Sequence, residues 1–249
     1  MGRRVLIAAP VRQKEEIFIE YLNSLNHLEI PNDVEIKKFF FLHNCPELAK
    51  YLNDDEYELL TDNSPLIKEV NKQKNWTQEN FDALSSMRTL LLRKTAKEEY
   101  DYLFTVDSDI LIHPKTLKLL LNDNKKIIGN MIWTKMKNSG ISAICGKNEE
   151  WGAYSEKELT ILQKQPGIYP VGWTCACLLI SSEICKNENI SYWPIPYIDN
   201  TGCEDYAFCM RVKCNFPNTQ IWIDNRLPAR HLYHEKDYER WMAEKAKYE

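Results

Sequence analysis

The chain has 249 residues, of which 44% are hydrophobic and 27% are charged, a balance that is ordinary for a globular protein. Its 32 basic and 36 acidic residues give a formal net charge of −4, so no basic excess points to a nucleic acid or to an anionic membrane surface. No run approaches the roughly 20 apolar residues that a membrane span requires, and the start "MGRRVLIAAPVRQKEE" lacks the pattern of a signal peptide. We therefore expect a cytoplasmic protein without a membrane span.

The first half of the chain predicts strands that alternate with helices. Short apolar runs predict strands at residues 4–10, 34–42, 102–106 and 125–133, and helical spacing predicts helices at 13–29, 46–60, 77–97 and 114–123. Pro114 is placed at the first position of the last of these helices. Such alternation predicts an α/β domain with a mostly parallel central sheet and helices on both faces.

The second half has a different composition. Residues 134–175 are rich in Gly, Ser, Asn and Trp and lack a long periodic segment, so they predict ordered loops around a site, with a small β-subdomain as the alternative. Further along, the pattern predicts strands at 175–181 and 219–224, a loop at 193–202, and helices at 203–214 and 235–249. No repeat or low-complexity linker is present, so residues 1–249 are predicted to form one domain.

Eight cysteines are present, and none of them forms a C-x-x-C pair. The count is low for a disulfide scaffold of this length, so reduced and mostly buried thiols are predicted. A zinc site formed by Cys203, Cys209 and Cys214 is the alternative, although the spacing differs from the usual zinc motifs.

The stretch "YDYLFTVDSDILIHP" places Asp107-Ser108-Asp109 directly after a strand that looks like core. In open α/β sheets, ligands bind beyond the carboxyl ends of the strands. Two carboxylates at such an end are suited to Mg²⁺ or Mn²⁺, which prefer oxygen ligands. The alternative is a turn in which Asp109 caps a helix or Ser108 forms a local hydrogen bond.

A second acidic pair, Glu204 and Asp205, begins a predicted helix after a glycine-containing loop. These carboxylates could act as a general base or contact an acceptor hydroxyl. The alternative is that they are simply favoured there by the helix dipole.

Three further groups have both a functional and a structural interpretation. His231 and His234 could be metal ligands or ordinary surface or core histidines, and Arg88 could meet a phosphate or be a solvated helix cation. Tryptophans stack on sugar rings and also fill cores; the candidates are Trp133, Trp151 and Trp173.

The order of these parts resembles the GT-A glycosyltransferases over nearly the whole chain. The stretches that carry the likeness are "VLIAAPVRQKEEIFIEYLNSL", "YDYLFTVDSDILIHP" and "GCEDYAFCMRV". The family 2 type of glycosyltransferase shares this order. In the second half, "NKKIIGNMIWTK", "EWGAYS", "GIYPVGWTCACLLIS" and "NRLPARHLYH" are similar to the glycosyltransferase domains of procollagen galactosyltransferases and lysyl hydroxylases, and more loosely to Anp1-type mannosyltransferases.

This resemblance implies a role for each matching residue. Asp107, Asp109 and His231 would bind Mn²⁺ or Mg²⁺, and Asp205 with Glu204 would serve catalysis on the acceptor side. The donor would be contacted by Pro10, Val11, Arg12, Arg88, Asp107, Ser108 and Asp109, and the acceptor by Trp133, Trp151 and Trp173. Residues 1–133 would form the nucleotide-sugar half and residues 134–249 the acceptor half.

The implied activity is transfer of a hexose from a UDP- or GDP-sugar to a hydroxyl of a carbohydrate, lipid or protein. The chain departs from many inverting members, because "LHNCPE" stands where they carry an acidic base-binding pair. The alternatives are a sugar-nucleotidyltransferase, a phosphatase with an aspartyl nucleophile, and a non-catalytic carbohydrate-binding protein on a transferase fold. The first of these would want a glycine-rich phosphate loop, and "IAAPVRQKEE" contains no glycine.

Overall fold

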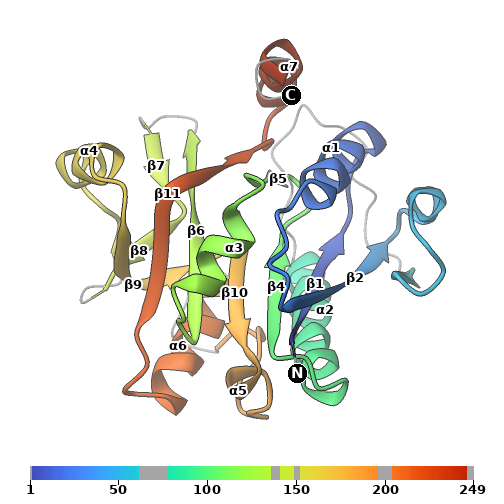
Figure 1. The fold of residues 1–249 in the computed structure, drawn as a ribbon, viewed down its shortest axis with the longest axis horizontal. Coiled ribbons are helices and arrows are strands. Elements are labelled where there is room, and N and C mark those ends of the chain that lie inside the picture. Colours follow the sequence, from blue (N-terminus) through green and yellow to red (C-terminus); the bar gives the residue numbers. More distant parts are fainter. Residues whose placement is uncertain (1, 62–77, 136–140, 149–151, 196–203, 246–249) are drawn as a thin grey trace.

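The computed structural model of the protein describes residues 2–61, 78–135, 141–148, 152–195 and 204–245 (Figure 1). Its strands are β1 (Arg3–Val11), β2 (Val34–His43), β3 (Tyr57–Leu60), β4 (Tyr102–Val106), β5 (Ile110–Leu111), β6 (Ile127–Lys135), β7 (Ile141–Ala143), β8 (Cys145–Lys147), β9 (Ile168–Thr174), β10 (Cys177–Ser181) and β11 (Ile221–His231). Its helices are α1 (Glu15–Asn26), α2 (Gln78–Lys97), α3 (Thr116–Asn122), α4 (Glu156–Lys164), α5 (Ser182–Cys185), α6 (Glu204–Asn215) and α7 (Glu235–Glu244), with a 3₁₀ helix η1 at Pro46–Tyr51.

The described strands form one sheet in the order β3-β2-β1-β4-β10-β6-β11-β9-β8, with β5 paired to β11 and β7 to β6. The predicted parallel pairing holds for β3, β2, β1 and β4 and for the β6–β11 pair. The remaining pairs are antiparallel, so the sheet is more mixed than the sequence predicts. Strand β10 runs antiparallel to both of its neighbours, β4 and β6; it follows β9 after a link of two residues and in the same direction, with β6 and β11 lying between the two strands.

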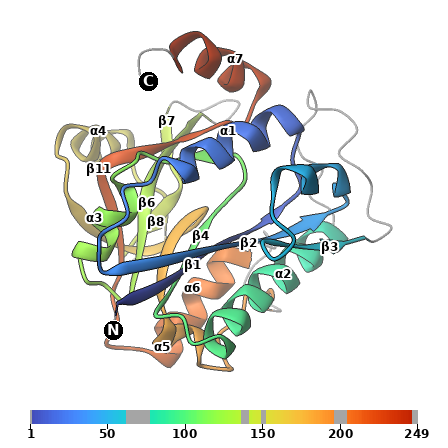
Figure 2. The same cartoon turned by 45° about the vertical axis from the view of Figure 1, so that its right-hand side comes forward.

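Helices cover both faces of the sheet, as Figures 1 and 2 show. Because side chains alternate along a strand, β1 sends Val5, Ile7 and Ala9 to one face and Leu6 and Ala8 to the other. The first face packs against α1 and α3, and the second against α2, α5 and α6. The predicted α/β class with a central sheet flanked by helices is therefore confirmed.

Several element boundaries differ from the sequence-based prediction. The segment expected to be a helix at 46–60 is the short 3₁₀ helix η1 followed by strand β3. Residues 134–175 contain β7, β8, α4 and β9 where loops were expected, so the alternative of a small β-structure describes them better. Pro114 lies ahead of α3, which begins at Thr116 rather than at the proline. Strand β11 continues past residue 224 to His231, which brings that histidine into the sheet.

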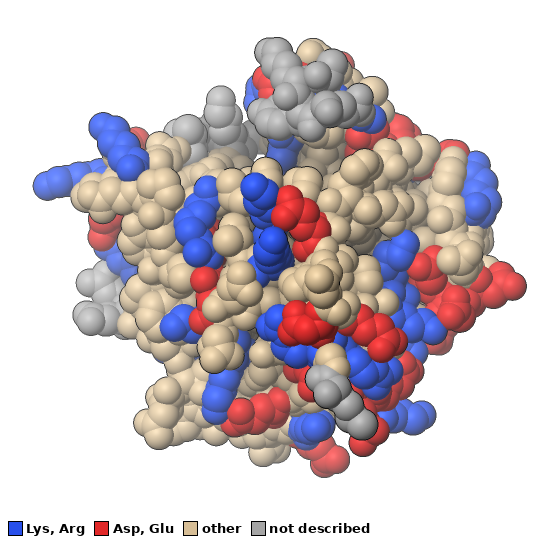
Figure 3. Space-filling model, in the orientation of Figure 1, with Lys and Arg blue, Asp and Glu red and all other residues tan. Residues whose placement is uncertain are grey.

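The surface charge and the helices test the predictions that nucleic acid and a membrane span are absent. Lysine and arginine lie interspersed with aspartate and glutamate on the face drawn in Figure 3, with no extended area of one sign. Among the described residues, none of the helices combines the length and apolar character that crossing a bilayer requires. The described cysteines are free thiols, as expected, and they include Cys209 and Cys214; Cys203 lies outside the described residues.

Candidate active site

The end of β4 carries the Asp-Ser-Asp motif to one edge of the sheet. Strand β4 is parallel to β1, so the carboxyl ends of both strands face the same edge. The hydroxyl of Tyr21, on α1, donates to the Val106 carbonyl at 2.8 Å, and the Asp107 N–H donates to the Ala176 carbonyl at 2.7 Å. Helix α1 and the link between β9 and β10 therefore fix the backbone just where the motif begins.

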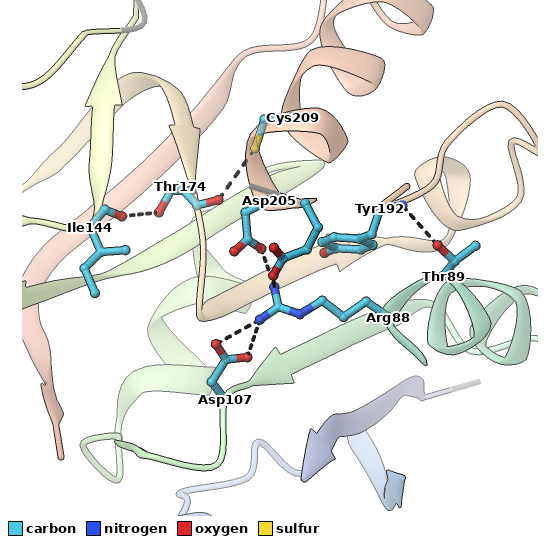
Figure 4. Close-up of polar contacts among 9 residues, drawn as sticks. Arg88, Thr89, Asp107, Ile144, Thr174, Tyr192, Asp205 and Cys209 are labelled. Atoms are coloured by element: carbon cyan, nitrogen blue, oxygen red, sulfur yellow. Dashed lines mark hydrogen bonds and ion pairs between the residues drawn. The ribbon is translucent and has the colours of Figure 1, made fainter. Parts of the chain in front are cut away.

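Asp107 meets the second acidic pair across the buried side chain of Arg88 (Figure 4). One terminal nitrogen of Arg88 donates to both Asp107 oxygens, at 2.8 and 2.9 Å. The other terminal nitrogen donates to Asp205 and lies 3.8 Å from a Glu204 oxygen. We refer to Arg88, Asp107, Glu204 and Asp205 as the arginine cluster. It joins α2, the end of β4 and the first turn of α6, so the two predicted acidic motifs are neighbours.

Burial shapes the charges of the arginine cluster. It raises the pKa of Asp205 well above the ordinary value; Arg88 opposes this, while Glu204 and Asp107 add to it. Burial also raises the pKa of Glu204, and the charge of Arg88 opposes this rise. Burial disfavours the charge on Arg88, but the surrounding carboxylates outweigh it and raise its pKa well above the ordinary value. A carboxylate with a raised pKa is a stronger base, which suits Asp205 to accepting a proton from a hydroxyl.

Neighbouring side chains that the sequence analysis did not single out hold the cluster in place. The Tyr192 ring stacks on Phe208 with 4.3 Å between centroids and 3° between planes, and the Arg88 guanidinium lies 5.5 Å from the Tyr192 centroid. The Cys175 thiol hydrogen-bonds to Asp205. Ala176, which accepts the Asp107 N–H, has a φ of 64°. Such strain in a non-glycine residue is characteristic of functional sites, and no sequence pattern announces it.

Asp109 faces a different partner, His231. Strand β5 pairs with β11 so that His231 lies opposite Ile110, and the Leu232 N–H donates to the Asp109 carbonyl at 2.8 Å. The His231 Nε2 lies 3.6 Å from an Asp109 oxygen. Its Nδ1 is buried and has no hydrogen-bond partner among the described residues. We refer to Asp109 and His231 as the histidine corner.

The other candidate histidine has a structural position. His234 is the N-cap of α7, and its backbone N–H donates to the Asp237 carboxylate at 2.9 Å. It lies after β11 rather than in it, whereas His231 is the last residue of the strand. The geometry therefore favours His231 over His234 as the partner of Asp109.

Buried asparagines shape the strand that delivers His231. The register of β11 against β6 shifts between Asp224 and Ala229. At this irregularity, Asn130 donates to the Leu227 carbonyl at 3.0 Å, and Asn225 accepts the Gly167 N–H at 2.6 Å. Backbone groups freed by a bulge need such partners when they are buried. Their only sequence signal is a polar residue inside each of two apolar strands.

The predicted metal ligands fit a divalent cation in chemistry but are not gathered into one set. Two carboxylates and an imidazole are suitable donors for Mn²⁺ or Mg²⁺. In addition, three carboxylates face the Arg88 guanidinium in the arginine cluster, and Asp109 faces the His231 imidazole in the histidine corner. Among the described residues, however, no three acidic, histidine or cysteine side chains converge as a metal site. Asp107 is turned toward Arg88, which accounts for this.

The predicted donor-side residues lie at the end of β1. Pro10 and Val11 are buried in the strand, and the Val11 carbonyl accepts the Cys45 thiol at 3.3 Å. Arg12 is half-buried and donates to the Asn80 side-chain oxygen at 3.0 Å. Ser108 is buried between the two aspartates. These residues share the sheet edge with Asp107, and Arg12 also contacts α2 through Asn80.

The predicted acceptor-side tryptophans lie in the second half of the sheet. Trp133, on β6, and Trp173, on β9, are half-buried and pack against the core on the α6 face. Trp173 lies opposite Gly146 on β8, where an added Cβ would come within 1.9 Å of the indole nitrogen. The glycine therefore makes room for the ring, which gives Trp173 a packing role. Trp151 lies outside the described residues.

Comparison with known proteins identifies a family and several relatives that this chain resembles. The model of the family "Glycosyltransferase family 25, N-terminal domain" matches residues 3–234. Procollagen galactosyltransferase 1-A of Xenopus laevis is 22% identical over 242 residues, which is 92% of this chain and 39% of that protein. The rat protein named multifunctional procollagen lysine hydroxylase and glycosyltransferase LH3 is 26% identical over 217 residues, which is 84% of this chain and 27% of its own length. The chain thus spans well under half the length of these curated relatives.

A solved structure supports the fold. The crystal structure of S. aureus TarS aligns with 99% of this chain and 65% of its own, with a TM-score of 0.50 and 15% sequence identity. At that identity the likeness concerns the fold alone. The family match covers almost all of the residues that carry the site, from β1 to the residues after β11. The chain therefore belongs to glycosyltransferase family 25 and carries the N-terminal domain of that enzyme family.

Proposed function

We propose that this chain is a metal-dependent glycosyltransferase domain that moves a hexose from a nucleoside-diphosphate sugar to an acceptor hydroxyl. One observation carries the proposal: Asp107 and Asp205, from opposite halves of the chain, meet on the single guanidinium of Arg88. A donor-side carboxylate and an acceptor-side carboxylate are thus held within the span of one side chain. Group transfer requires such closeness, because the donor and acceptor must react without an intervening water.

Asp109 and His231, together with Asp107, would hold Mn²⁺ or Mg²⁺ in this proposal. When bound, such a cation neutralises the charge that develops on the diphosphate leaving group. The buried Nδ1 of His231, which has no hydrogen-bond partner within the described part of the chain, and the closeness of His231 Nε2 to Asp109 support this assignment. Ser108 lies between the two aspartates and would contact the donor, as would Pro10, Val11 and Arg12 at the end of β1.

Asp205 is assigned to the acceptor. In an inverting reaction its carboxylate takes the proton of the attacking hydroxyl, and its raised pKa suits that task. In a retaining reaction it would instead position the acceptor. Glu204 lies beside it at the start of α6 and adds negative charge that raises the pKa of Asp205 further. Trp133 and Trp173 are proposed as aromatic contacts for the acceptor.

The relatives suggest which substrates to try first. The Xenopus laevis relative is named a procollagen galactosyltransferase, so a galactosyl donor and a protein hydroxyl acceptor form the first pair. Other UDP- or GDP-hexoses, and carbohydrate or lipid acceptors, are the next choices. The cytoplasmic location and the division into a donor half at 1–133 and an acceptor half at 134–249 stay predictions from the sequence.

A thermal-shift screen tests the proposal. Nucleoside diphosphates and nucleotide sugars are added with and without Mn²⁺, because a ligand that binds the folded state raises its melting temperature. We expect a shift that requires both Mn²⁺ and one nucleotide, followed by release of the nucleoside diphosphate when an acceptor is added. Release of pyrophosphate would instead indicate a sugar-nucleotidyltransferase. Binding of sugar with neither transfer nor donor hydrolysis would indicate a non-catalytic carbohydrate-binding protein.

A further inference from the structure

The side chain of Arg88 is too deeply buried to contact a substrate directly from solution. Its side chain is 4% exposed, and both terminal nitrogens face protein carboxylates rather than open space. One terminal nitrogen contacts both oxygens of Asp107 and the other contacts Asp205, so the two ends of the guanidinium bridge two charged partners, and hydrogen bonds between charged groups are the strong ones. With both terminal nitrogens directed at Asp107 and Asp205, the guanidinium acts through those carboxylates.

Packing fixes the position of this side chain. The Tyr192 ring lies beside the guanidinium, and the Tyr192 N–H donates to the hydroxyl of Thr89, the residue that follows Arg88, at 3.0 Å. Five residues along α2, Arg93 donates to four backbone carbonyls, those of Cys185, Asn187, Glu188 and Ile190. Helix α2 is therefore tied to the segment 185–192, and Arg88 projects from a rigid support.

We propose that Arg88 is a positioning residue and the internal counter-ion of the site. It holds Asp107 at a set distance from Asp205 and balances their charge while no cation is bound. The inference rests on the proposed function, because it concerns the same carboxylates. A consequence follows from Coulomb's law. Arg88 and a divalent cation compete for Asp107, so the cation binds more tightly when the guanidinium is removed.

The decisive experiment compares Arg88→Met with the matched control Arg93→Met. Both substitutions remove a guanidinium from α2, but Arg93 contacts carbonyls and Arg88 contacts carboxylates. Melting temperature is measured in EDTA and in Mn²⁺, and the Mn²⁺ dissociation constant is measured by electron paramagnetic resonance. We expect both variants to melt lower than the wild type in EDTA. In Arg88→Met alone, Mn²⁺ should restore more stability than in the wild type and bind about tenfold more tightly.

A second variant, Arg88→Lys, keeps the positive charge. It allows the proposal to be tested even if Arg88→Met does not fold. A lysine ammonium is a point charge with one nitrogen, so it cannot contact Asp107 and Asp205 from two separate nitrogens as the guanidinium does. We expect the Mn²⁺ dissociation constant to stay within about threefold of the wild type. The transfer kcat should fall about 100-fold with little change in the donor KM, because misplacement of one carboxylate suffices for that loss.

The outcomes separate this inference from the proposed function. Absence of any Mn²⁺ and nucleotide shift in the wild type would overturn the proposed function. If the wild type binds both, Mn²⁺ affinity in Arg88→Met equal to or weaker than the wild type would overturn the counter-ion role. Wild-type kcat in Arg88→Lys would overturn the positioning role.

Discussion

Asp107 and Asp109 are separated by one residue, yet the arginine cluster that holds the first and the histidine corner that holds the second differ in charge and partners. In the arginine cluster, three carboxylates surround a guanidinium that pairs with each of them. In the histidine corner, one carboxylate lies 3.6 Å from an imidazole whose other nitrogen is buried and has no partner among the described residues.

This difference indicates that the two aspartates of the Asp107-Ser108-Asp109 motif have different roles. The arginine cluster contains its own counter-ion, so it can be assembled before any substrate arrives. Among the described residues, both His231 Nδ1 and Arg88 Nε are buried without a hydrogen-bond partner, but an arginine nitrogen can only donate, whereas an imidazole can bind a cation, so the histidine corner is the part that a cation would complete. We therefore expect substitutions in the arginine cluster to affect chemistry most, and those in the histidine corner to affect cation binding most.

The largest effect is expected from Asp107→Ala and Asp109→Ala, which remove one carboxylate from each region. Both should lower the transfer rate by about 1,000-fold or more, because each removes charge from the proposed cation and donor site. The exposed Asp54→Ala is the control and should transfer at the wild-type rate. The fold should tolerate Asp107→Ala better than Asp109→Ala. Without Asp107, Arg88 still pairs with Asp205, whereas Asp109 is buried, at 5% exposure. Full activity in either variant would contradict the metal-site assignment.

The next effect separates the two acids of α6 inside the arginine cluster. Asp205→Asn should reduce kcat by about 100-fold to 10,000-fold, the range for loss of a general base, because its carboxylate binds Arg88 directly. Glu204→Gln should cost less, since its oxygen lies 3.8 Å from the guanidinium. Initial rates with saturating donor measure both. Equal losses would show that the pair acts as one unit rather than through Asp205.

A smaller effect tests the histidine corner. His231→Ala should weaken Mn²⁺ binding about tenfold, because an imidazole ligand is lost. His234→Ala should leave Mn²⁺ binding unchanged and cost less than about 1 kcal/mol of stability, since the cap of α7 uses the backbone N–H. A Mn²⁺ titration of both variants is the measurement. Equal or reversed effects would reject His231 as the ligand.

The smallest effect is the pH dependence of the metal-free fold. Burial raises the pKa of Asp205 and Glu204, so the native state keeps protons that the unfolded state loses above about pH 4. The free energy of unfolding should therefore fall as pH rises from there through the raised native pKa values. The slope is at most about 1.4 kcal/mol per pH unit for each proton.

Urea unfolding in EDTA at several pH values measures this slope, with Asp205→Asn as the comparison. That substitution removes one of the two buried titrating carboxyl groups, so its slope should be shallower. Stability that rises with pH in the wild type, or an unchanged slope in Asp205→Asn, would show that Arg88 outweighs burial in the arginine cluster.

Much of the scaffold could be predicted from local sequence patterns. The strand before Asp107, the helix that starts at Glu204 and the alternation of the first half each depend on a continuous run of residues. The region 134–175 lacks a visible period of two, because β7 and β8 are three residues long and because glycine or proline interrupts β8 and β9. The role of Trp173 likewise depends on Gly146, a cross-strand neighbour that its own surroundings in the sequence do not reveal.

The sequence by itself determined which residues could do chemistry: the paired aspartates at a strand end, the acidic helix start and the late histidine. Only the tertiary structure decided which of them share a site. Arg88 contacts Asp107, 19 residues away in the sequence, and Asp205, 117 residues away. The physical reason is that strand register and helix packing bring these groups together, and both arise from contacts between segments that are distant along the chain.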